Sequence, residues 1–149
     1  MVYKILPLEE NYMIPEFNKY GNLPDDIYKV TLKEIKKKFG SESLQRKILF
    51  KHLNSLTELL SKNKIVIKRF IIDGSFVTDV EFPNDIDCII IFNKNFSYRN
   101  SLLMKLKKCK MMHIFDYTEY IDANEYNGMI NLWKHTRDKK LKGILEVKL

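Results

Sequence analysis

The feature that most restricts the fold of this 149-residue chain is a pair of apolar, largely β-branched runs near its middle. The first reads IVIKRFIID over 65–73, and the second reads DIDCIIIF over 85–92. Short runs that leave neither face polar are typical of strands covered on both faces. Such strands need helices packed against them, so the chain is predicted to fold as an α/β or α+β domain.

Segments with apolar residues at helical spacing alternate with these strands. The predicted helices cover 25–39, 43–62, 97–108 and 123–135. The first of them is expected to begin at Asp25 and Asp26, because helix N-termini prefer carboxylates, and to end at Gly40. Two further strands are predicted over 111–121 and 142–149. We therefore expect a small mixed β-sheet with flanking helices.

The length fits one domain, preceded by an irregular segment. Residues 1–24 contain three of the four prolines and are predicted to form an N-terminal arm that wraps the domain. The domain itself is predicted to cover 25–149. A hydrophobic share of 45% excludes disorder for most of this length.

The cysteine content and the lengths of the apolar runs predict a cytoplasmic protein with no membrane segment. The two cysteines form no disulfide framework or CxxC pair, which favours a reducing compartment. The N-terminal apolar stretch is too short for a signal peptide, and no run approaches the roughly 20 apolar residues of a membrane span. The net charge of +7 is compatible with phosphate-bearing partners but names none of them.

An acidic pair opens the second apolar run. Asp85 and Asp87 are two positions apart, so on an extended strand their side chains emerge on one face while Ile86 points to the other. Two like charges beside an apolar strand raise at least one pKa or bind a cation. Carboxylate oxygens suit Mg²⁺, which proteins hold with one or two carboxylates together with substrate phosphates. The alternative is a pair of solvated acids that contact lysines.

A glycine and a serine follow the first apolar run. Gly74 allows the backbone to approach a ligand closely, and Ser75 offers an amide and a hydroxyl. A short helical turn beginning at Ser75 would present free amides to a phosphate. Alone, this pair is also compatible with an ordinary tight turn.

The order of these features is more specific than any one of them. An apolar strand, Gly74-Ser75, nine intervening residues and Asp85-Ile86-Asp87 give FIIDGSFVTDVEFPNDIDCIIIF. This pattern resembles the DNA polymerase β-like nucleotidyltransferase superfamily. The opening IPEFNKYGNLPDDI and the closing WKHTRDKKLKGILEV look like a small group of stand-alone bacterial members.

The resemblance implies transfer of a nucleoside monophosphate from a nucleoside triphosphate, expected to be ATP, to a hydroxyl, with release of pyrophosphate. Asp85 and Asp87 would hold two Mg²⁺ ions, and Gly74 and Ser75 would hold the triphosphate. Superfamily members usually add a third carboxylate from a neighbouring strand. Asp116 is expected to fill this role as catalytic residue and metal ligand.

Several alternatives stay open at this level. Glu119 is the other candidate for the third carboxylate. The acceptor could be a nucleic acid or a protein partner, as in toxin-antitoxin pairs whose antitoxin modifies the toxin. A catalytically inactive module that binds nucleic acid or a protein is the competing class. The three histidines form no recognisable metal or nucleophile pairing. Possible phosphate contacts are Lys64, Lys68, Arg69, Arg137 and Lys142.

Overall fold

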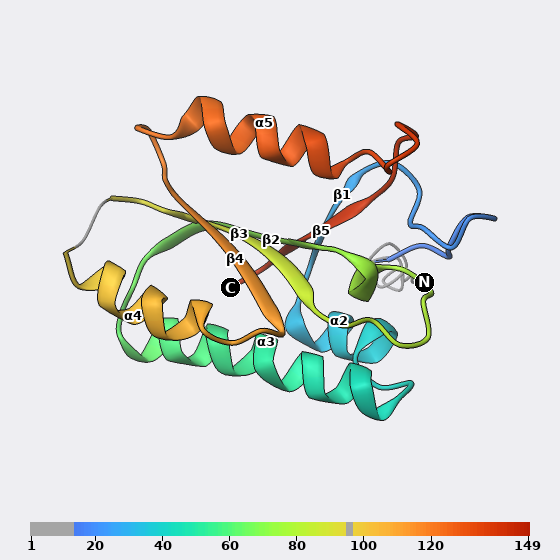
Figure 1. Ribbon diagram of the computed structural model, residues 1–149, viewed down its shortest axis with the longest axis horizontal. Helices are drawn as coiled ribbons and strands as arrows, with labels where there is room; N and C mark the ends of the chain where they lie inside the picture. Colours follow the sequence, from blue (N-terminus) through green and yellow to red (C-terminus); the bar gives the residue numbers. More distant parts are fainter. Residues whose placement is uncertain (1–13, 95–96) are drawn as a thin grey trace, which may run out of the picture.

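The computed structural model describes residues 14–94 and 97–149, in which five strands form one mixed sheet of order β1-β5-β2-β3-β4 (Figure 1). The strands are β1 (Ile27–Val30), β2 (Ile67–Asp73), β3 (Ile86–Phe92), β4 (Met112–Thr118) and β5 (Ile144–Val147). The helices are α2 (Leu32–Phe39), α3 (Leu44–Lys62), α4 (Ser97–Lys107) and α5 (Ala123–Trp133), and η1 (Ser75–Val77) is a short 3₁₀ turn. This arrangement confirms a small mixed α/β domain.

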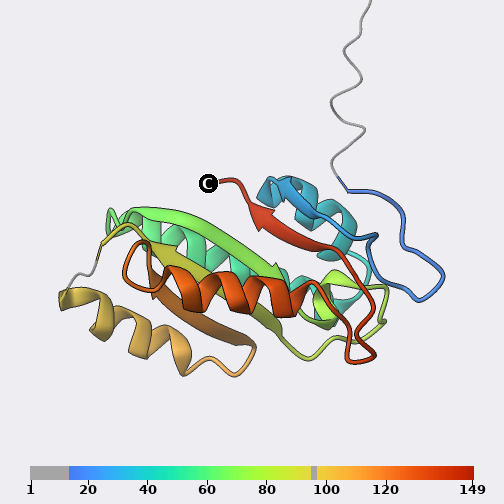
Figure 2. The same cartoon turned by 90° about the horizontal axis from the view of Figure 1, so that it is seen from above.

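The helices cover both faces of the sheet, which explains why β2 and β3 are apolar on both sides. Helices α2, α3 and α4 lie on one face, where they enclose the larger core with side chains such as Phe70, Ile90 and Leu103. Helix α5 covers the other face, where Ile89 and Ile130 belong to a smaller cluster. Figure 2 views the sheet from the side that α5 covers.

The register between β3 and β4 determines which side chains can meet at the site. The two strands are parallel and joined by α4, with Asp87 opposite His113 and Ile90 opposite Asp116. Strand β2 pairs with β3 in the antiparallel direction, with Asp73 opposite Asp87. The C-terminal end of β2 and the N-terminal ends of β3 and β4 therefore share one edge of the sheet.

The expected helix over 25–39 is wrong in its first part. Residues Ile27–Val30 form strand β1, which pairs in parallel with β5, and the helix begins at Leu32. Thr31 is the N-cap and forms a capping box with Glu34. Asp26 instead accepts a hydrogen bond from the backbone N–H of Ile27. The β-branched residues of this segment satisfy their backbone groups in the sheet, and this tertiary pairing overrides the helical spacing.

The described part of the predicted arm packs against the domain. Leu23 is fully buried in the larger core, and Asn22 forms an isolated bridge with Thr78. Residues 1–13 of the arm lie outside the described residues. Across residues 14–94 and 97–149, no helix combines the length and apolar character required to cross a bilayer.

Candidate metal centre

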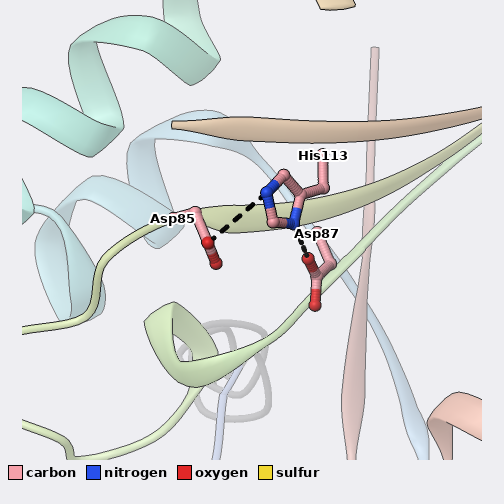
Figure 3. Close-up of side chains that lie close together, drawn as sticks. All are labelled: Asp85, Asp87 and His113. Carbon is pink, nitrogen blue, oxygen red and sulfur yellow. Dashed lines mark hydrogen bonds and ion pairs between the residues drawn. The ribbon is translucent and has the colours of Figure 1, made fainter. Parts of the chain in front are cut away.

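Three side chains converge where β3 and β4 begin: Asp85, Asp87 and His113 (Figure 3). The imidazole of His113 lies between the two carboxylates. Its Nδ1 is 3.2 Å from an oxygen of Asp87, and its Nε2 is 3.6 Å from an oxygen of Asp85. One ligand atom from each residue lies within 4.8 Å of the others. This group has the composition and closeness of a site that could hold a metal ion.

Strand geometry brings the two carboxylates together as the alternation predicts. Ile86 is fully buried in the larger core, whereas Asp85 and Asp87 remain partly exposed on the other face. Burial is the largest cause that raises the pKa of Asp87, followed by the charge of Asp85, while His113 and Lys142 act in the opposite direction. The site is therefore short of positive charge when both carboxylates are ionised.

The turn after β2 brings its backbone close to this group. Gly74 has a φ of +93°, a conformation that L side chains rarely adopt. A Cβ at this position would lie 3.1 Å from Oδ2 of Asp87. The positive φ and the short distance to the Asp87 carboxylate both favour glycine at position 74. The turn η1 begins at Ser75. The hydroxyl of Ser75 has no hydrogen-bond partner among the described residues.

A buried ion pair between Asp73 and Lys142 lies directly before the Gly74 turn. Asp73, at the end of β2, accepts a hydrogen bond from the ammonium of Lys142, and both side chains are largely buried. Burial raises the pKa of Asp73 to about 6, against the opposing effect of Lys142. Asp73 therefore serves as the partner of Lys142, and a hydrogen bond from the backbone N–H of Gly74 also opposes the rise of its pKa.

The predicted phosphate-binding cations differ in their distance from the acidic pair. Lys142 lies near Asp87 as well as Asp73, since its charge acts on the pKa of both carboxylates. Lys68 and Arg69, by contrast, pair with Glu119 and Glu146. Both are at the start of β2, whereas Gly74 follows its end. Of these three cations, Lys142 is the one that lies near the acidic pair, and its ammonium already donates to Asp73.

The structure does not bring Asp116 to the acidic pair. Asp116 is opposite Ile90, whose side chain belongs to the larger core, so its side chain lies on the opposite face from Asp87. Its carboxylate pairs with Lys107 of α4. Glu119 follows the far end of β4, about 20 Å along the strand direction from His113 at 3.3 Å per residue.

The expectation that the histidines lack a recognisable pairing is wrong for His113. The sequence does contain a signal for this contact, namely a strand, a helix and a strand over 86–118. Such a unit makes the two strands parallel, so that residues near their starts share one edge. This rule favours a residue at the start of the strand over one in its middle, and therefore His113 over Asp116.

Replacing Lys142 by methionine is expected to lower the free energy of unfolding by about 2 kcal/mol at pH 7.5, because it leaves Asp73 buried without its cation. The folded-state pKa of Asp73 is already above its ordinary value and would rise further. The extra cost in the variant arises where Asp73 is ionised in the native protein, above its pKa of about 6, so the loss should be largely absent at pH 5.

Urea unfolding at pH 7.5 and pH 5 measures this effect. The matched control is Lys29→Met, which removes an exposed lysine from β1 and should change stability by less than about 0.5 kcal/mol at either pH. An equal loss for Lys142→Met at both pH values would contradict the assignment of the effect to Asp73.

Fold and site together define a small α/β domain with a candidate divalent-ion site beside a glycine turn at one edge of a mixed sheet. A family model described as "Family of unknown function (DUF6932)" matches residues 15–148. The match covers most of the chain, so the protein belongs to this family. Neither the curated proteins nor the solved structures include one that matches the chain.

Proposed function

We propose that the protein is a metal-dependent nucleotidyltransferase that transfers a nucleoside monophosphate, AMP from ATP in the simplest case, to a hydroxyl group. The observation that carries this proposal is the meeting of Asp85, Asp87 and the Gly74 turn at one edge of the sheet. The superfamily resemblance places the acidic pair and Gly74-Ser75 together in the same way. The name of the family gives no function, so the proposal depends on the site and the motif.

The proposed roles follow from the positions of the groups. Asp85 and Asp87 would hold divalent ions, which would neutralise the triphosphate and stabilise the attacking and leaving oxygens of an in-line displacement. Gly74 lets the triphosphate approach the backbone, and the Ser75 hydroxyl is available to donate to a phosphate oxygen. The reaction would form a bond between the acceptor oxygen and the α-phosphorus and break the bond from the α-phosphorus to the pyrophosphate oxygen, and the acceptor hydroxyl would release its proton to water.

The proposed acceptor is a hydroxyl on a protein partner. The protein would then modify its partner in the way that some antitoxins modify their toxins. The domain is small, and within residues 14–94 and 97–149 the sheet and its helices form one unit with no second domain to hold an acceptor. A nucleic-acid hydroxyl is the other acceptor, because the net charge of +7 favours phosphate-bearing partners.

A second candidate function is a module that keeps the fold and binds nucleic acid or a protein without chemistry. The position of His113 favours it, because its ring already occupies the space between Asp85 and Asp87. Asp116, expected as the third carboxylate, lies on the other face of the sheet. The two candidates differ in whether a divalent ion replaces this contact.

Incubation with ATP labelled at the α-phosphate, in Mg²⁺ or Mn²⁺, together with partner proteins and RNA, tests the proposal. We expect label on an acceptor with the native protein and with the control Asp138→Ala, which changes an exposed loop carboxylate. Asp85→Ala should give no labelling. Absence of labelling with either ion, together with salt-sensitive RNA binding that is indifferent to metal and to Asp85→Ala, would favour the binding module.

A further inference from the structure

The third donor of the candidate metal centre is an imidazole, whereas the nucleotidyltransferase resemblance leads one to expect a carboxylate there. His113 is opposite Asp87 in the parallel register, and its ring reaches both members of the acidic pair. Asp73 is the nearby carboxylate on β2, but it is largely buried and accepts a hydrogen bond from Lys142. The donor set is therefore two carboxylates and one histidine.

The distances do not describe a tight pairing of a charged imidazole with two carboxylates. Charge-assisted N–H···O bonds are usually about 2.7–2.9 Å long. The contact with Asp87 is 3.2 Å and that with Asp85 is 3.6 Å. Donors that share an ion at about 2.1 Å lie no more than about 4.2 Å apart. The three ligand atoms lie within 4.8 Å of one another, so the side chains would have to move slightly closer together to bind one ion.

The orientation of the ring also suits metal binding. One ring nitrogen faces each carboxylate, so one nitrogen can bind an ion while the N–H of the other donates to a carboxylate. This second hydrogen bond commonly orients histidines that bind metals. Oδ1 of Asp87 faces His113, and Oδ2 lies nearer the Gly74 turn. The carboxylate thus keeps one oxygen for an ion. The side chain of His113 is 53% exposed, which leaves room for adjustment.

We propose that this centre selects a first-row transition ion, represented by Mn²⁺, over Mg²⁺. Mg²⁺ prefers oxygen ligands and keeps several waters, whereas an imidazole nitrogen strengthens binding of transition ions. The inference rests on the proposed function, because it names the ion that the nucleotide site uses. It predicts that Mn²⁺ binds at least about tenfold more tightly than Mg²⁺.

Isothermal titration calorimetry of the 149-residue chain with Mn²⁺ and with Mg²⁺ measures the ratio of the two affinities directly. In His113→Asp the donor set becomes three carboxylates, and the preference for Mn²⁺ should fall several-fold, mainly because Mg²⁺ binds more tightly. In His113→Ala the affinity for Mn²⁺ should fall about tenfold. His135→Ala is the matched control, since it removes a histidine that contacts the backbone oxygen of Asn131, and it should leave both affinities unchanged.

An NMR measurement identifies the ligand without reference to activity. The chain has three histidines, His52, His113 and His135, so their ring signals can be followed together. Paramagnetic Mn²⁺ at substoichiometric concentration should broaden the ring signals of His113 first. Circular dichroism of each variant establishes that it is folded, and the exposure of His113 makes large destabilisation unexpected.

The outcomes separate this inference from the proposed function. Equal affinity for the two ions, no binding of either, unbroadened His113 signals at saturating Mn²⁺, or an unchanged ratio in His113→Asp would each overturn the inference. Labelling of an acceptor in the ATP assay would uphold the proposed function even then. Conversely, tight Mn²⁺ binding at His113 with no transfer in either ion would uphold the inference and count against the proposed reaction.

Discussion

Replacement of Asp87 by asparagine is expected to reduce the proposed nucleotide transfer by about 10³-fold or more while the fold persists. Charge stabilisation by a bound ion contributes several kcal/mol to a transition state, and about 1.36 kcal/mol corresponds to a tenfold change in rate. Asp87 lies at the centre of the proposed site, between Asp85, His113 and the Gly74 turn. An amide keeps the shape of the carboxylate but binds cations weakly.

The same substitution should leave stability unchanged or raise it at pH 7. Burial and the charge of Asp85 raise the pKa of Asp87, so ionisation of this group disfavours the folded state as the pH rises above the ordinary pKa of an aspartate. Asparagine carries no charge and removes this cost. Activity and stability should therefore move in opposite directions, as is common for residues selected for function.

Initial rates of label transfer and urea unfolding at pH 7 measure the two effects on the same preparation. Asp138→Asn is the control, because it changes an exposed aspartate in the loop before β5 and should alter neither quantity. Transfer within tenfold of the native rate in Asp87→Asn would contradict the assigned role. A loss of stability in proportion to the loss of activity would instead indicate a structural role for Asp87.

Replacement of Arg46 by methionine is expected to lower the free energy of unfolding by about 3 kcal/mol or more. The guanidinium is buried in the domain and extends from α3 into the loop that joins β2 to β3. It donates hydrogen bonds to the backbone oxygens of Phe39, Phe76, Thr78 and Val80. Each net hydrogen bond contributes about 1 kcal/mol, and hydrogen bonds to a charged donor contribute more.

Arg46 also determines the position of the proposed site. The loop that it holds carries Gly74 and Ser75 at one end and Asp85 at the other. The guanidinium additionally lies over the ring of Phe76, which is fully buried. A variant that loses these contacts should bind a nucleotide analogue and a divalent ion more weakly even where it remains folded.

Urea unfolding followed by far-UV circular dichroism measures the stability change. Lys47→Met, at the neighbouring exposed position of α3, is the control and should change stability by less than about 0.5 kcal/mol. Arg46→Lys should be intermediate, because an ammonium keeps the charge but cannot reach four acceptors with the geometry of a guanidinium. A loss below 1 kcal/mol in Arg46→Met would show that the loop is held by other contacts.

Apolar periodicity predicted the parts of the fold in which local preference and burial agree. Residues 70–72 of β2 and 88–92 of β3 are apolar and buried, and helices cover the sheet on both faces. Four leucines of α3 are buried, and the N-cap of this helix is Ser43, the residue at which the predicted helix begins. These elements depend on residues close together in the chain.

The errors arose where pairing between distant segments decides the outcome. Ile27–Val30 forms a strand because β5, more than 100 residues later, provides its hydrogen bonds. Asp85 and Asp87 were identified because their proximity follows from alternation along one strand. His113 was missed because its contact with them depends on the register of β4 against β3, and that register also places Asp116 on the other face.

The most direct test of the proposed site is a crystal of the protein soaked with Mn²⁺ and a non-hydrolysable ATP analogue. We expect a manganese peak in anomalous difference density, with Asp85, Asp87 and His113 as ligands of the ion and the triphosphate against Gly74 and Ser75. Nucleotide or manganese bound elsewhere, with the imidazole of His113 still filling the space between the two carboxylates, would contradict it.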